Sequence, residues 1–433
     1  MFFKSLPLRA KDIITGIVTI VAILVLTISN VGAEDTSTYL GLSEAENLAL
    51  NLDTLSQSFT AEADALNYQA VADAQFADPR LKVGAMNFPL DTFDRGQEPM
   101  TQLQIGVQQL FPRGKTLAYK SGKTESLAGV ESARAANQRL LVLRSVRKAY
   151  IDLYFQKQSG NILTENEQLF SQLLDITERQ YAVGRDNQHD VLRAQLELSL
   201  LQDKLSEISG MKEMAIAELS KWISLEHASR TLPEEQPVLN ALSSLSSITT
   251  NLHQHPLILA QDSLIDASKH QVQIAKEQYK PGILLDVTYG ERTGRDLNGS
   301  GRADFFSAMV LVDIPIFTDK RQDKRLSASQ QKHLAAKFKR TDRLRELKRQ
   351  TERNYARWKQ LGKRYSLYES RTIIEAEQNA EATLKAYQND IADFTTLVRA
   401  RLTELNTRLA MLRLSVDQAR SQVDLLYYAG EER

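Results

Sequence analysis

The stretch "QYAVGRDNQHDVLRAQL" at residues 180–196 and a related stretch, "AYQNDIADFTTLVRARL" at residues 386–402, decide how this chain is organised. In each, a short polar segment interrupts a helical pattern. The two align at an offset of 206 positions, and "LFPRGK" at 110–115 aligns with "IFTDKR" at 316–321 at the same offset. Because one offset is kept across both pairs, we interpret the chain as a tandem duplication. Identities at this offset in the first pair are Tyr181 with Tyr387, Arg193 with Arg399, Ala194 with Ala400, and Leu196 with Leu402.

Two long tracts without proline, residues 113–232 and 316–433, are expected to be helical. Both are rich in Ala, Leu, Gln, Glu, Lys and Arg, which favour helices, and they lack the main helix breaker. Apolar residues step by three and four along each tract, which is typical of coiled-coil packing. Helices are therefore expected at about 43–76, 115–183, 187–227, 255–279, 321–389 and 391–428.

Each half also contains an expected β-hairpin just before its longest helix, at residues 81–111 and 283–317. Apolar and polar residues alternate along these strands, and loops rich in Gly, Asp, Asn and Pro join them. Strands of roughly 9 to 11 residues with this alternation match those of a transmembrane barrel, with apolar side chains toward lipid. Four strands cannot close a barrel, so other copies of the chain are expected to complete it.

The N-terminus carries three basic residues, an apolar run from Ile13 to Ile28, and small residues up to Ala33. This order is typical of a signal peptide, so we expect residues 1–33 to be removed on export. The alternative is an uncleaved membrane anchor, although the run is shorter than the roughly 20 residues that a spanning helix needs.

Composition excludes several classes of chemistry. The 433 residues include no cysteine, which removes disulfides, thiolate metal sites and cysteine nucleophiles. Lys plus Arg and Asp plus Glu both total 54, so no net field favours nucleic acid. No arrangement of nucleophile and base and no phosphate-binding glycine loop stands out, and we expect neither enzymatic activity nor a cofactor.

These features together, with the "GVQQLFPRGKT" join between strand and helix, resemble the TolC-like outer-membrane efflux protein family. The resemblance covers nearly the whole mature chain. It divides the chain into a signal peptide (1–33), a first repeat (34–230), a linker (231–254) and a second repeat (255–433). It implies a mainly α fold with a small membrane β part: four strands per chain in a trimeric twelve-stranded outer-membrane β-barrel, continued by a periplasmic α-helical barrel.

Function and partners follow from the same resemblance. It implies a homotrimer that acts as the passive exit duct of a tripartite efflux system in the outer membrane of a Gram-negative bacterium. The duct would contact outer-membrane lipid and a periplasmic adaptor (membrane fusion) protein, and would serve an inner-membrane pump, with an RND-type pump favoured over an ABC-type pump. The strand followed by "FPRGK" is similar to members that serve heavy-metal and cation pumps, so metal cations or drugs are the expected cargo.

The resemblance also assigns roles to the two turns that join each long helix to its return helix. These turns form the periplasmic tip, where the adaptor docks. In the first repeat the docking turn corresponds to Val183, Gly184 and Arg185, where glycine supplies backbone freedom. In the second repeat, Asn389, Asp390 and Ile391 lack the glycine, although Asn and Asp tolerate the same left-handed conformation.

Family members often carry acidic rings beyond the tip that constrict the pore. The corresponding positions hold Thr396 and Arg399, so that pattern is not kept. We hypothesise that Asp390 and Asp393 supply the ring instead, since threefold symmetry would concentrate their charge. The alternative is that they are ordinary carboxylates at a helix start. Tyr181 and Tyr387 are candidate latches that bond across helices and hold the tip shut, with simple packing as the alternative.

The remaining polar clusters have plainer interpretations. Asp186, His189 and Asp190 suggest a metal site, but they align with Ala392, Thr395 and Thr396, so we interpret the segment as a helix reversal near the aperture. His253 and His255 are expected in a polar loop between the repeats. The basic run at residues 337–359 is expected to be a solvated, salt-bridged helix face and not a nucleic-acid site.

Two other functions fit part of the pattern. The outer-membrane component of a type I protein secretion system would look nearly identical in sequence. A periplasmic coiled-coil scaffold with an uncleaved N-terminal anchor would explain the helices, but it would not explain the paired amphipathic hairpins.

Overall fold

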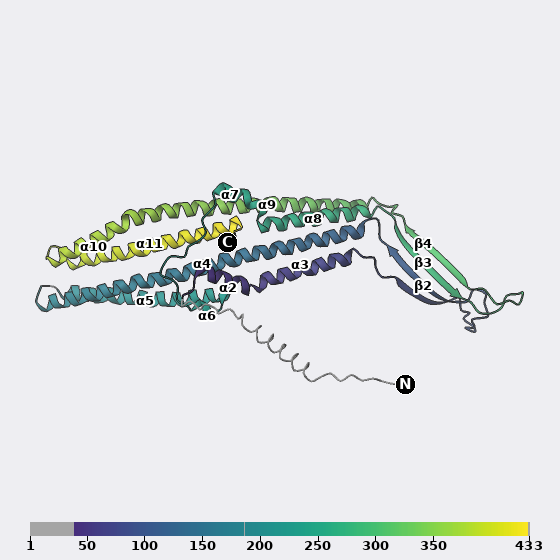
Figure 1. Cartoon of the computed structure of the whole chain (residues 1–433), viewed down its shortest axis with the longest axis horizontal. Helices are drawn as coiled ribbons and strands as arrows, with labels where there is room; N and C mark the ends of the chain where they lie inside the picture. Colours follow the sequence, from purple (N-terminus) through teal and green to yellow (C-terminus); the bar gives the residue numbers. More distant parts are fainter. Residues whose placement is uncertain (1–38, 186, 432–433) are drawn as a thin grey trace, which may run out of the picture.

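The computed structural model describes residues 39–185 and 187–431, so the expected signal peptide at residues 1–33 lies outside the described residues. The chain forms a long rod of antiparallel helices with a sheet at one end and two helical turns at the other (Figure 1). This confirms the expected mainly α fold with a small β part. No helix within the described ranges is both long enough and apolar enough to cross a membrane.

The first repeat contains four helices that build the rod, one short helix and two strands. Their bounds are α2 (Leu42–Leu52), α3 (Thr54–Asp73), β1 (Arg80–Met86), β2 (Gln102–Phe111), α4 (Thr116–Ala182), α5 (Gln188–Ile223) and α6 (Leu225–Ala228). The helix α4 runs the length of the rod, and α3 and α5 pack against its two ends. The sequence predicts one helix at 43–76, whereas the structure has two, because Asp53 ends α2 and caps α3.

The second repeat has the same order of elements. Its bounds are α7 (Leu245–Asn251), a 3-10 turn η1 (Leu252–Gln254), α8 (Pro256–Glu277), β3 (Gly282–Glu291), β4 (Phe305–Asp313), α9 (Gln322–Leu367), a π-helical turn η2 (Tyr368–Thr372), α10 (Ile373–Gln388) and α11 (Phe394–Ala429). The helices α9 and α10 together occupy the tract that corresponds to α4, which is an uninterrupted helix of 67 residues. The π turn is therefore a difference between the repeats.

Three helix contacts link the two repeats into one wall. Near the sheet, α3 packs on α4, α4 on α8, and α8 on α9, and Figure 1 shows these helices side by side in that order. At the far end, α5, α4, α11 and α10 continue the wall. Only the first and last helices of each row lack a neighbour on one side within the described chain.

The four strands form one antiparallel sheet in the order β1-β2-β3-β4. The two hairpins are joined by β2 and β3, which pair in register from Leu103 with Glu291 to Phe111 with Ile283. One side of β1 and one side of β4 have no partner strand within the described chain. The last strand ends at Asp313, before the expected limit at residue 317, because Pro315 has no N–H for a ladder bond.

The two largest buried clusters help to hold the rod together. One lies at mid-length, where α2, α4, α5 and α11 meet, and it includes Val146, Tyr150 and Val423. Beside it, the Arg147 guanidinium pairs with the Glu46 carboxylate at 2.6 Å, and the Arg147 side chain is only 5% exposed. The other cluster lies toward the helical turns and draws on α4, α5, α10 and α11.

Candidate functional site

The turn that ends α4 is a Schellman motif, in which the last helical carbonyls bond N–H groups beyond the helix end. The Arg185 N–H donates to the Gln180 carbonyl at 2.9 Å, and the Gly184 N–H donates to the Tyr181 carbonyl at 2.9 Å. Gly184 has φ +76, the left-handed conformation that this motif requires. The side chain of Val183 is 71% exposed, so the turn presents an apolar group at the end of the rod.

The turn that ends α10 has the same geometry without a glycine. The Ile391 N–H donates to the Ala386 carbonyl at 2.9 Å, the Asp390 N–H donates to the Tyr387 carbonyl at 3.1 Å, and Asp390 has φ +57. Asp390 therefore adopts the left-handed conformation that the sequence predicts for it. Ile391 is 80% exposed, so this turn too presents an apolar side chain.

Asp393 begins α11 as its N-cap. Its carboxylate accepts a hydrogen bond from the Thr396 N–H at 2.7 Å. The hydrogen bonds from Thr396 lower the pKa of the Asp393 carboxyl, and the positive charges of Arg399 and Arg193 lower it further. Asp393 is therefore ionised at neutral pH, and one of its oxygens is occupied by a capping bond.

The two helical hairpins are joined near their turns by bonds between the repeats. The Tyr387 hydroxyl donates to the Gln180 side-chain oxygen at 2.9 Å, and the Arg193 guanidinium donates to the Thr395 hydroxyl at 3.1 Å. The Tyr387 ring also packs edge-on against Phe394, with centroids 5.9 Å apart. The two hydrogen bonds join α10 to α4 and α5 to α11, and so connect the two hairpins of one chain near their turns.

The two tyrosines that match in sequence do not match in environment. Tyr387 is 5% exposed, whereas Tyr181 is 48% exposed. The π turn at Tyr368–Thr372 precedes Tyr387 and has no counterpart in α4. Tyr387 belongs to the buried cluster of α4, α5, α10 and α11, whereas Tyr181 does not. The structure thus separates two candidate latches that the sequence could not distinguish.

The other predicted aperture residues lie around these turns. Asp390, Thr396 and Arg399 are exposed, and Asp190 is partly exposed in the first turn of α5. Asp186 lies outside the described residues. No cluster of metal-ligating side chains occurs in the described part of the chain, and His189 stands exposed on α5.

At the opposite end of the rod, the sheet has one apolar face and one polar face. The apolar face exposes large side chains, among them Leu81 (69%), Val83 (74%) and Phe306 (73%). They alternate with polar side chains that point to the other side, as the period of a strand requires. An exposed apolar face of this kind is suited to lipid.

The polar face holds a network that sequence reasoning missed. The Lys82 ammonium on β1 reaches the Asp286 carboxylate on β3 at 2.9 Å, and Gln108 and Thr288 donate to the same carboxylate at 2.6 and 2.8 Å. The intervening strand carries Gly106, where a Cβ would lie 2.7 Å from the Thr288 hydroxyl. The glycine therefore leaves room for a contact that spans three strands. Only the strand register brings these residues together, so no local sequence signal indicates it.

The expectation of a polar loop at His255 was wrong. His255 is 2% exposed and caps α8, where its Nδ1 accepts a hydrogen bond from the Leu257 N–H at 3.3 Å. Its Nε2 lies 3.2 Å from the Tyr427 carbonyl, and burial lowers the pKa of the imidazole to about 4. The signal was Pro256, because proline favours the first helical position and so marks the preceding residue as the cap.

Comparisons with known proteins bear on this architecture. Residues 248–431 match the family profile described as outer membrane efflux protein. The second repeat thus resembles outer membrane efflux proteins in sequence. The profile spans the second repeat, while no curated protein sequence matches the chain. The expected family resemblance is thereby confirmed.

Solved structures extend the likeness to both repeats. The outer membrane protein VceC from Vibrio cholerae is 19% identical, with a TM-score of 0.74 over 90% of this chain and 96% of that one. The Campylobacter jejuni CmeC outer membrane channel is 16% identical, with a TM-score of 0.73 over 90% and 85%. The open state of the Neisseria gonorrhoeae MtrE outer membrane channel is 15% identical, with a TM-score of 0.70 over 91% and 89%. These likenesses show the fold of an outer-membrane channel.

Proposed function

We propose that this protein is the outer-membrane exit duct of a tripartite efflux system. Three copies would form a twelve-stranded β-barrel in the outer membrane, continued by a helical barrel in the periplasm. The duct would passively conduct substrates, metal cations or drugs, that a periplasmic adaptor and an inner-membrane pump hand over. The choice of substrate would be made by the pump, with an RND-type pump favoured. In support, the described residues of the duct include no group of three or more side chains that could hold a metal ion.

The four-stranded sheet is the observation that supports this proposal most strongly. It exposes apolar side chains on one face and holds the Lys82–Asp286 network on the other. Among the described residues, β1 and β4 each lack a partner strand on one side. Unpaired strand edges are not tolerated in lipid, because each free N–H or C=O would lose its water. Pairing β4 of one copy with β1 of the next removes both edges and closes the barrel.

The helical turns are the proposed docking and gating end. Val183, Gly184 and Arg185 form one docking turn, and Asn389, Asp390 and Ile391 form the other. The exposed Val183 and Ile391 side chains support this role, since an adaptor with a complementary apolar surface would cover them.

The signal peptide at 1–33, the linker at 231–254 and the two repeats remain our proposed division of the chain.

The function is tested by extracting the protein from outer membranes in detergent and measuring its mass and its conductance in planar bilayers. We expect the mass of a trimer and discrete steps of ion current across the bilayer. A water-soluble elongated dimer without conductance would overturn the proposal and favour a periplasmic scaffold.

The proposed acidic ring has a separate test. Asp390→Asn and Asp393→Asn together should reduce the preference of the open channel for cations, because three copies of each carboxylate would line a narrow axis. Asp323→Asn, far along the rod at the start of α9, is the matched control. Unchanged selectivity in the double variant would leave both residues as turn and cap residues only.

A further inference from the structure

The helix α9 carries far more positive than negative charge. Its 46 residues include fifteen Lys or Arg and four Asp or Glu. Among the described residues, ion pairs in the basic run at 337–359 involve only Arg340, Lys348 and Arg349, so the expected salt-bridged face is only partly paired. Like charges that gather in one place repel each other, so the binding of an anion at that place is favoured.

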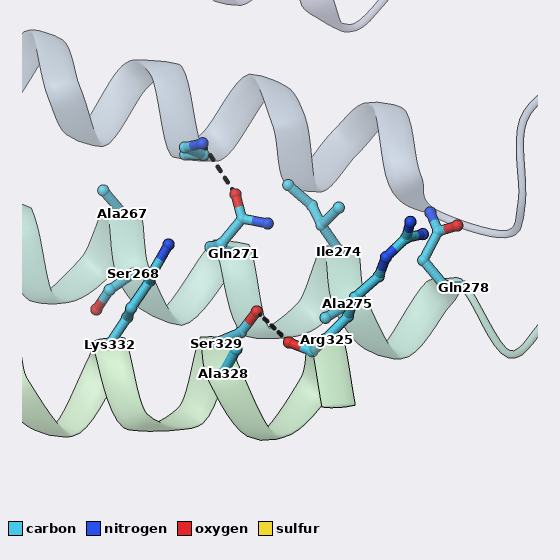
Figure 2. Close-up of a pocket in the computed structure, with 11 residues that line it drawn as sticks. Ala267, Ser268, Gln271, Ile274, Ala275, Gln278, Arg325, Ala328, Ser329 and Lys332 are labelled. Carbon is cyan, nitrogen blue, oxygen red and sulfur yellow. Dashed lines mark hydrogen bonds between the residues drawn. The ribbon is translucent and has the colours of Figure 1, made fainter. Parts of the chain in front are cut away.

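Positive charge gathers at a cavity of about 620 Å³ between α8 and α9. Its charged lining residues are all basic: Lys123 of α4, and Arg325 and Lys332 of α9. Arg325 and Lys332 are seven residues apart, or about two helical turns, so they lie on one face of α9. In Figure 2 their charged ends extend across α8, on either side of Gln271 and Ile274. None of the three cations has an ion pair among the described residues.

Two carboxylates flank the end of the cavity that lies toward the sheet, and both have other partners. Asp323 accepts a hydrogen bond from the Tyr279 hydroxyl at 2.5 Å. Glu277 pairs with the Lys280 ammonium at 2.7 Å. Neither carboxylate lines the cavity, and neither do the other acidic residues of α8 and α9. The lining therefore holds three positive charges and no negative charge of its own.

The polar side chains of the lining add hydrogen-bond donors. The Lys123 ammonium donates to the Gln271 side-chain oxygen at 2.9 Å, so the amide nitrogen of Gln271 points to the other side, away from Lys123 (Figure 2). Lys123 also lowers the pKa of the Asp73 carboxyl, but that carboxylate is bonded by the Thr124 hydroxyl at 2.7 Å. An anion in the cavity would therefore meet N–H donors from all three helices.

Small side chains leave the space that an anion needs. Ala267 and Ala275 of α8 are each 5% exposed, and Ser329 of α9 is 9% exposed. These buried residues line the cavity between the long basic side chains. The cavity is thus lined by short side chains along the helix contact and by cations around it.

The first repeat has no counterpart of the two cations on α9. At the repeat offset of 206, Arg325 corresponds to Tyr119 and Lys332 corresponds to Ser126 in α4. The same stretch of long helix therefore forms in the first repeat without either charge. The fold does not require these two cations, which favours a role in binding.

We propose that this cavity binds a phosphate group, carried either by a membrane lipid or by a soluble molecule. The guanidinium of Arg325 matches the oxygens of a phosphate with two parallel N–H groups, and the two lysines supply compact positive charges. The cavity begins within about one turn of the sheet connections, because Gln278 caps α8 and Arg325 is the fourth residue of α9. In the proposed duct, this end lies near the membrane surface. All the lining residues belong to one chain, so the site does not depend on the proposed ring of copies.

Phosphorus-31 NMR of the full chain in detergent tests the site. Inorganic phosphate and dihexanoyl phosphatidylglycerol are titrated separately, and each should broaden and shift its signal in a saturable way if it binds. Tighter binding of the lipid would assign the phosphate to the membrane, and tighter binding of inorganic phosphate would assign it to a soluble molecule. Saturable binding of neither probe would overturn the proposal. Equal competition by acetate at the same concentration would overturn the assignment to phosphate.

Charge variants place the binding in the cavity. Arg325→Gln with Lys332→Gln should weaken the binding of phosphate about tenfold or more, because two charged donors are lost. The matched control is Lys324→Gln with Lys337→Gln, which removes the same charge from α9 at residues outside the lining and should change the affinity less than twofold. Equal weakening in both double variants would show that the overall charge of α9 attracts phosphate, and would overturn the site.

A variant on another helix guards against a folding defect in α9. Lys123→Gln on α4 removes the third cation and should weaken the binding about threefold or more, with the circular dichroism of the wild type. Wild-type affinity in folded Lys123→Gln and in the folded double variant of the lining would contradict the proposal.

Discussion

The sharpest prediction concerns the hydroxyl of Tyr387. Its donation to Gln180 at 2.9 Å joins the two hairpins of one chain close to the turns. Tyr387→Phe removes this bond and keeps the ring, so the packing against Phe394 remains. If the bond holds the tip shut, the variant should shift the duct toward its open form. Tyr181→Phe changes a tyrosine that is 48% exposed and should have no such effect.

The magnitude follows from the burial of the bond. A hydrogen bond of this kind contributes roughly 1 kcal/mol net, which is about a fivefold change in the equilibrium of one chain. If the three chains open together, the closed state loses about 3 kcal/mol of stabilisation, and the open-to-closed ratio rises roughly a hundredfold or more. Independent opening would give only the fivefold change in each chain.

Single-channel recording in planar bilayers measures this ratio as the fraction of time spent in the high-conductance state. We expect Tyr387→Phe to spend a much larger fraction of time in the high-conductance state than Tyr181→Phe, and Tyr181→Phe to equal the wild type. Equal recordings for all three proteins would leave Tyr387 as a packing residue. An equal increase in both variants would refute the different roles that we assign to the two tyrosines.

Three further predictions concern stability. His255 has a folded pKa of about 4, below the ordinary 6.5, so the folded state binds fewer protons than the unfolded state between these values. The contribution of His255 to the free energy of unfolding is therefore complete above about pH 6.5. About 3 kcal/mol of it is lost as the pH falls toward 4. His255→Asn keeps a capping group, and thermal melts between pH 7 and 5 should show a smaller loss than in the wild type; parallel loss would contradict the assignment. Glu46→Ala leaves the nearly buried Arg147 without this carboxylate and should cost about 3 kcal/mol in thermal or denaturant unfolding, whereas a cost below about 1 kcal/mol would show that the pair is not important. Gly184→Ala should destabilise its turn by about 1 kcal/mol because φ is +76, while Asp390→Gly should relieve its turn, so limited proteolysis at the two turns should change in opposite directions; a change in the same direction would contradict the shared geometry.

Much of the architecture could be predicted from the sequence because the decisive signals are periodic or local. The offset of 206 and the absence of proline defined the long helices to within a few residues, as the observed bounds of α4 and α11 show. Alternation located the four strands, and Gly184 marked its turn by the backbone freedom that the Schellman motif needs. The left-handed conformation of Asp390 followed from the short polar side chain that aligns with that glycine.

The rest depends on contacts that no local pattern encodes. Lys82 reaches Asp286 across a strand only because the register aligns Gly106 between them. The π turn at Tyr368–Thr372 lies in a tract without proline, so the main helix breaker does not indicate it. The burial of His255 depends on its contact with Tyr427 of α11, which lies far away in the sequence.

The central claim is that copies of this chain close one barrel by pairing β4 of one copy with β1 of the next. A single-particle reconstruction of the detergent-purified complex tests this most directly. We expect threefold symmetry and twelve strands around an open lumen, with Phe306 and Val83 on its outer face. A reconstruction in which either strand edge stays unpaired, or in which the copies associate through the helical turns alone, would contradict the account.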